Sequence, residues 1–124
     1  MSPKIGQFVD KWIKFHDMLE EDPRRDDYWP EVSEVMDWHY SRPERLWQFI
    51  LLVYRRKPSQ RVVSNLAAGP LEDLLSIHGY KFIERIMTLA RTDIDFNHLL
   101  GGVWQNAMPD EIWKILQAVR NEVW

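Results

Sequence analysis

Apolar residues recur every three or four positions along most of the chain, and proline or glycine interrupts this pattern at short intervals. This spacing is typical of amphipathic helices, whereas the strict alternation of a half-buried strand is almost absent. We therefore predict an all-α fold of about eight short helices. Their expected ranges are 2–20, 29–40, 43–56, 59–69, 70–79, 80–91, a seventh after Asp93 or Asp95, and an eighth from Pro109.

The expected helices follow one another through tight turns, which favours packing as antiparallel hairpins in a compact bundle. A solenoid-like stack is the alternative arrangement. The helix over 43–56 is apolar on nearly all sides between residues 46 and 54. Because a helix with this pattern has no polar face to turn toward water, we expect it at the centre of the bundle.

Several expected helices begin with a residue suited to capping. Ser2 precedes Pro3, which fits an N-cap followed by proline at the first helical position. Ser41 and Glu44 have the spacing of a capping box. Ser59 is the expected cap of the next helix.

Two glycine-containing segments stand out in the C-terminal half. Gly69 followed by Pro70 predicts that one helix stops and another starts at once, because glycine favours helix ends and proline favours helix beginnings. Gly101 and Gly102 predict a helix kink or a close approach between helices, with Trp104 covering the space that glycine leaves.

Composition narrows the function classes. The 124 residues, 45% hydrophobic and 28% charged, are typical of a single folded domain spanning 1–124. The absence of cysteine excludes disulfides and thiolate chemistry. The net charge of −3 without a basic face disfavours nucleic-acid binding. With no visible secretory signal or membrane span, we expect a cytoplasmic protein that binds no membrane and needs no cofactor.

The candidate catalytic and metal-binding residues each have a structural explanation. Asp95 and His98 can share a helix face, and His78 would complete a metal-binding set, but no HExxH pair or carboxylate cluster reinforces it. We therefore predict structural histidines and no metal site. Glu72 and Asp73 are adjacent and point in different directions, so they fit the positive end of a helix dipole better than an acid–base pair.

Tryptophan is the unusual residue, with seven copies beside four tyrosines. We expect Trp12, Trp47 and Trp104 in the core. Trp29, Trp38 and Trp113 fall off the best apolar stripes, so packing and partner binding both remain open for them. Exposed aromatic residues beside acidic ones make good anchors in protein interfaces. The predicted partner-binding set is Tyr28, Trp29, Asp37, Trp38 and Tyr40.

A second candidate site lies near the double glycine. Gln105 and Asn106 offer amide hydrogen bonds next to the aromatic ring of Trp104. If His78 and His98 lie close to them, the five residues would form a pocket for a small ligand or substrate.

The segment 65–113 resembles a family of small bacterial proteins of uncharacterised function. The resemblance rests on LAAGPLEDLL at 66–75, the His78-Gly79 step and LGGVWQNAM at 100–108. It implies a single helical domain and carries no established reaction.

These observations favour a non-catalytic binding module, and we hypothesise an immunity-type inhibitor that neutralises a basic toxin or effector. Acidic side chains would steer the partner and aromatic side chains would anchor it. A phage-encoded inhibitor of a bacterial defence system, the small-ligand pocket described above and self-association into a homodimer are the alternatives.

Overall fold

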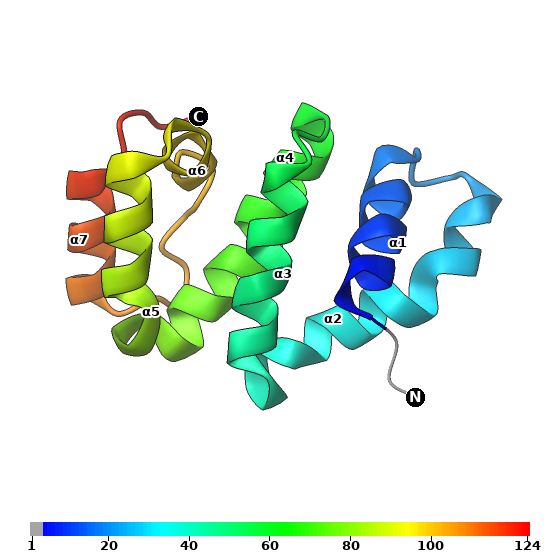
Figure 1. Ribbon diagram of the computed structural model, residues 1–124, viewed down its shortest axis with the longest axis horizontal. Helices are drawn as coiled ribbons and strands as arrows, with labels where there is room; N and C mark the ends of the chain where they lie inside the picture. The colour runs from blue at the N-terminus through cyan, green and yellow to red at the C-terminus, as the bar shows by residue number, and fades with distance from the viewer. Residues whose placement is uncertain (1–3) are drawn as a thin grey trace.

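The computed structural model describes residues 4–124, and the predicted all-α fold is confirmed. The N-terminal helices lie at one end of the longest axis of the molecule and the C-terminal helices at the other (Figure 1). The elements are α1 (Ile5–Asp17), the 3₁₀ helix η1 (Pro23–Tyr28), α2 (Trp29–Ser41), α3 (Pro43–Arg55), α4 (Gln60–Leu66), the π-helical turn η2 (Ala67–Leu71), α5 (Glu72–Thr92), α6 (Ile94–Leu100) and α7 (Asp110–Val119).

Helix α3 lies in the middle of this arrangement, as its apolar pattern predicts. It contacts α1, α2, α4, η2, α5 and α6. Phe49, Ile50 and Val53 are completely buried. Rings from its neighbours pack against it, with the centroid of the Trp12 ring 5.5 Å from that of Phe49. The core therefore forms around α3, and α1 and α2 cover one side of it.

The predicted helix stop at Gly69-Pro70 is wrong. The chain is continuously helical from residue 60 to residue 92, and both residues lie inside the π-turn η2. Proline lacks the N–H that an α-helix needs, and its ring collides with the carbonyl four residues earlier. The wider π-turn accommodates both effects. Gly69 also has no positive φ angle, so nothing in its backbone ends the helix.

The predicted helix end at Gly79 is also wrong. Helix α5 continues through it, with a kink at His78, where φ is −122° and ψ is 24°. A Cβ atom on Gly79 would lie 3.0 Å from Ile112 Cγ1 of α7. Gly79 thus permits a close approach of two helices, and fewer separate helices exist than predicted.

The capping predictions have mixed outcomes. Ser59 caps α4 by accepting a hydrogen bond from the Val62 amide, as expected. Asp93 caps α6 in the same way. The capping box is wrong, because Ser41 lies in the last turn of α2 and Glu44 instead pairs with Arg85 at 2.7 Å. The expected cap at Ser2 lies outside the described residues.

The double glycine forms a seat for Trp124, and not for Trp104 as predicted. Cβ atoms on Gly101 and Gly102 would come within 2.6 Å and 2.4 Å of the Trp124 ring. The Trp124 amide donates to the carbonyl of Gly101 at 2.9 Å. Trp104 is 60% exposed, so its expected place in the core is wrong. The glycines follow α6 in a turn and leave the helix itself unkinked.

Candidate functional site

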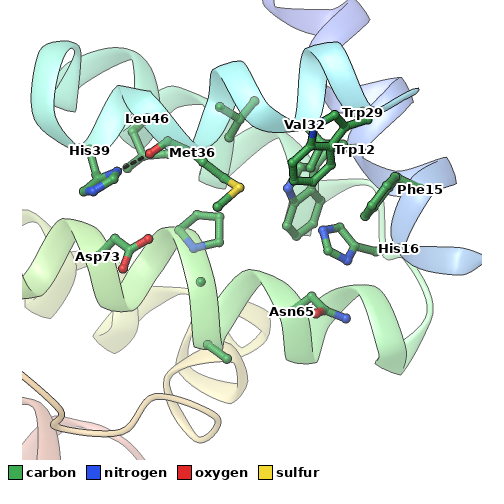
Figure 2. A pocket seen from close by; sticks show the side chains of 14 residues that line it. Trp12, Phe15, His16, Trp29, Val32, Met36, His39, Leu46, Asn65 and Asp73 are labelled. Atoms are coloured by element: carbon green, nitrogen blue, oxygen red, sulfur yellow. Dashed lines mark hydrogen bonds between the residues drawn. The ribbon is translucent and has the colours of Figure 1, made fainter. Parts of the chain in front are cut away.

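A cavity of about 400 Å³ lies between α1, α2 and the segment α4–η2–α5, and we call it the α2 pocket. Figure 2 shows α2 on one side of it and the α4–α5 segment on the other. Trp12 and Phe15 of α1 and Trp29 and Met36 of α2 contribute its apolar walls. Such a cavity, mostly apolar with a few polar groups, is the usual form of a binding site.

The small residues of the π-turn make room for the cavity. Ala68, Gly69 and Pro70 of η2 line the cavity. Figure 2 shows the α4–α5 segment, which includes η2, on the side opposite α2. A Cβ atom added to Gly69 would meet nothing within 4 Å, so this position faces open space. The Gly69-Pro70 step therefore shapes the wall of the pocket. It does not separate two helices, contrary to the prediction from the sequence.

One polar group of the pocket is the carboxylate of Asp73, in the first turn of α5. Burial raises the pKa of this carboxyl group, and the nearby charge of His39 acts in the opposite direction. In the part of the chain that the structure describes, no hydrogen-bond or ion-pair partner of the Asp73 side chain is found. Figure 2 shows Asp73 and His39 facing each other across the gap between α5 and α2.

His39 is held in place from two sides. Its Nδ1 donates a hydrogen bond to the Met36 carbonyl. Its own carbonyl accepts a hydrogen bond from His78 Nε2 at 2.7 Å. His78 is the residue at the kink of α5, so the kink ties this helix to α2 beside the pocket.

The other end of the pocket is aromatic. The ring of His16 packs against Trp12, with 4.2 Å between centroids, and against Phe15 at 5.1 Å. Burial, followed by the charge of Arg25, lowers the pKa of His16 to about 4. His16 is therefore neutral at pH 7. The guanidinium of Arg25 lies 3.9 Å from the centroid of the Phe15 ring.

The predicted partner-binding residues, four on α2 and Tyr28 at the end of η1, differ in their exposure. Trp38 is only 2% exposed and packs between Phe8 and Phe49, so its expected availability to a partner is wrong. Trp29 is 47% exposed and lines the pocket. Tyr40 is exposed, and its ring packs at a tilt against that of His39. Tyr28 is half-buried and Asp37 is exposed.

The residues of the second predicted site make their observed contacts with different partners. His98 contacts Glu122 and the ring of Trp124, whereas His78 bonds to α2. Within residues 4–124, no hydrogen bond or ring contact links either histidine to Trp104, Gln105 or Asn106. Trp113, left open between packing and binding, is half-buried and packs against the core.

Glu72 explains the conformation of the loop that carries Trp104. Its buried carboxylate accepts hydrogen bonds from the Trp104 amide at 3.2 Å and from the Asn106 side chain. Gln105 donates to Asp110 at 2.7 Å. These polar residues therefore hold the connection between α6 and α7, and dipole stabilisation is not the main role of Glu72.

Sequence reasoning missed Asp73, His39, His16 and Met36 as members of one site. Asp73 was assigned to the helix dipole, and the other three lie on α1 and α2, far away in sequence. The available signal was the run of small residues at 67–70, which marks a place where a helix surface leaves space. No three His, Cys, Asp or Glu side chains among residues 4–124 are grouped so that they could hold a metal ion. None of the helices described here combines the length and apolar character needed to cross a bilayer.

Comparison with known proteins places the chain in an uncharacterised family, as its motifs predict. Residues 18–123 match the model of DUF6869, a family of unknown function. The match extends well beyond the segment 65–113 and includes α2, α3 and α4. Neither the curated proteins nor the solved structures contain a match.

Proposed function

The chain belongs to DUF6869, and because this family has no described function, we propose one from the site: a non-catalytic module that binds a partner protein over the α2 pocket. The observation that carries the proposal is the rim of the pocket. Trp29 and Met36 line the cavity and are nevertheless 47% and 55% exposed. Large apolar side chains left in this position are available to a second surface.

The composition of the rim suits a protein partner. Tryptophan is among the residues that contribute most binding energy in interfaces, and methionine adapts its shape to different partners. Tyr40 extends the same exposed surface along α2 beyond the pocket. A side chain of the partner would fill the cavity, and the exposed side chains of the rim would contact the partner residues on either side of it.

The class of function that we propose is that of an immunity-type inhibitor, which blocks a basic toxin or effector by covering it. Asp37 and Glu34 are exposed on α2, and the chain has a net charge of −3. Negative charge beside an apolar anchor accelerates encounter with a basic protein. The main ionisable groups outside the pocket support the fold: Glu72 holds a loop and Asp93 caps a helix.

The test begins with a photo-crosslinking amino acid at position 36, on the rim, and at position 117, on the exposed side of α7, as the control. A partner crosslinked from position 36 is then purified, and its affinity is measured for the unmodified chain and for Gly69→Phe, which fills the cavity. Gly6→Phe is the matched control, because a Cβ atom at Gly6 on α1 also meets nothing within 4 Å.

We expect Gly69→Phe to weaken the complex at least about tenfold, as truncation of a binding hot spot does. Gly6→Phe should leave it unchanged. The proposal is wrong if position 36 crosslinks no protein beyond those captured from position 117, or if both phenylalanine variants bind the partner like the wild type.

A small-ligand site is the second candidate, because the cavity of about 400 Å³ falls within the range of roughly 300–1,000 Å³ that such sites have. The exposed rim favours the protein partner. Both candidates predict the same sensitivity to Gly69→Phe, and the crosslink from position 36 separates them.

A further inference from the structure

The ionisable side chains that line the α2 pocket are His16, His39 and Asp73. Of all the residues that line the cavity, Asp73 alone is an Asp, Glu, Lys or Arg. Two other helix carboxylates have cationic partners: Glu31 lies 2.7 Å from Lys11, and Glu44 lies 2.7 Å from Arg85. Asp73 has no such partner in the described part of the chain.

An unpartnered carboxylate in an apolar cavity is costly, because it has lost part of its contact with water without gaining a hydrogen bond. Burial accordingly raises the pKa of Asp73. His39, the group of α2 whose charge acts on Asp73, already donates its Nδ1 hydrogen to the Met36 carbonyl. A hydrogen-bond donor with a positive charge is the group that would stabilise the Asp73 carboxylate most.

The cavity also fixes the shape of this donor. Met36 lies between the Asp73 end and the aromatic end in Figure 2. Gly69 and Pro70 of η2 also line the cavity. An apolar stem placed along these residues brings a terminal charge to Asp73. Lysine and arginine have this form, with an aliphatic stem and a charged end.

We propose that the partner inserts a lysine or arginine side chain whose stem lies against Met36 and Pro70 and whose charged end binds the Asp73 carboxylate. This proposal rests on the proposed function, because it names the chemistry of the partner that the pocket receives. The charged end of the inserted side chain points toward Asp73 and away from Phe15, because the guanidinium of Arg25 already lies on the Phe15 ring at the opposite end of the pocket. The aromatic end of the pocket is then free for an apolar residue of the partner that lies next to its lysine or arginine.

The test uses peptides, so it does not require the natural partner. A phage-displayed library of random peptides is selected on the full chain, after removal of phage that bind Gly69→Phe. We expect the enriched peptides to share a lysine or arginine next to an aromatic or aliphatic residue. Synthetic versions should bind Asp73→Asn at least about tenfold more weakly than the wild type, as loss of a charged hydrogen bond predicts.

Asp95→Asn is the matched control. Asp95 lies in the first turn of α6 as Asp73 lies in the first turn of α5, so the substitution removes the same charge at an equivalent helix position. Peptide affinity should not change. Replacement of the peptide's lysine by norleucine provides a second readout that does not alter the protein, and it should also weaken binding at least about tenfold.

Different outcomes separate the two proposals. Enriched peptides that lack a basic residue, or that bind Asp73→Asn and the norleucine peptide as tightly as their parents, overturn the inference and leave the protein-binding function standing. Failure to enrich any peptide overturns both. Binding of n-butylammonium as tight as that of the peptides assigns the pocket to a small amine and also overturns both.

Discussion

Acid should destabilise this protein through His16, and the size of the effect reports how dry the α2 pocket is. Burial lowers the pKa of His16 from its ordinary value of 6.5 to about 4. Between these two pH values the unfolded chain binds a proton at this position and the folded chain does not. The free energy of unfolding therefore rises with pH across this interval, and acidification lowers it again.

The magnitude follows from the two pKa values. Each pH unit between the two pKa values changes the free energy of unfolding by about 1.4 kcal/mol. Protonation of His16 therefore lowers the free energy of unfolding by about 2 kcal/mol at pH 5 and by about 3 kcal/mol at pH 4. Carboxyl groups also titrate in this range, so the contribution of His16 has to be read as a difference between variants. His16→Gln removes the titrating ring and keeps a neutral polar side chain.

The assay is urea unfolding at pH 7 and pH 5, followed by circular dichroism. Wild type should lose about 2 kcal/mol more than His16→Gln on going from pH 7 to pH 5. His98→Gln is the control, because that ring contacts Glu122 and Trp124 away from the pocket. If wild type and His16→Gln lose stability in parallel, His16 is hydrated and the pocket is not the apolar site described above.

Three further substitutions test the structural roles assigned here. Gly69→Ala should raise the free energy of unfolding by about 0.5–1 kcal/mol in thermal denaturation, because its Cβ meets open space in a helical backbone; a loss of stability contradicts this. Gly102→Ala should lower it by about 1–2 kcal/mol by displacing Trp124, and should cost clearly less in a Trp124→Ala background, where the Ala67 Cβ at 3.0 Å is the remaining close neighbour; equal costs in both backgrounds refute the proposed seat. Glu72→Ala should cost about 1–3 kcal/mol and accelerate hydrogen exchange at the Trp104 amide, and unchanged exchange there contradicts the role of Glu72.

The features that sequence predicted well depend on local interactions. The central position of α3 follows from its own apolar pattern, and the cap at Ser59 is made with an amide three residues away. The sequence left Asp93 and Asp95 open as the start of the seventh helix, and the cap that forms, at Asp93, is local in the same sense. Such features can be predicted without knowing how distant parts of the chain pack together.

The features that sequence missed depend on packing between distant elements. Gly69 and Pro70 carry the signals of a helix boundary, but the neighbouring helices hold them in one continuous π-turn. Trp29 and Trp38 lie nine residues apart on one short helix, and only its docking on α1 and α3 decides that Trp38 is buried and Trp29 exposed. Asp73 becomes a candidate site residue only because α2 closes a cavity over it.

The central claim is that the α2 pocket is the binding site, and one affinity comparison tests it most directly. The partner crosslinked from position 36 is titrated against wild type, Gly69→Phe and Gly6→Phe, with equal melting temperatures as the criterion for intact folding. A dissociation constant raised at least about tenfold by Gly69→Phe alone is the expected result. Equal affinity of all three chains would contradict the account.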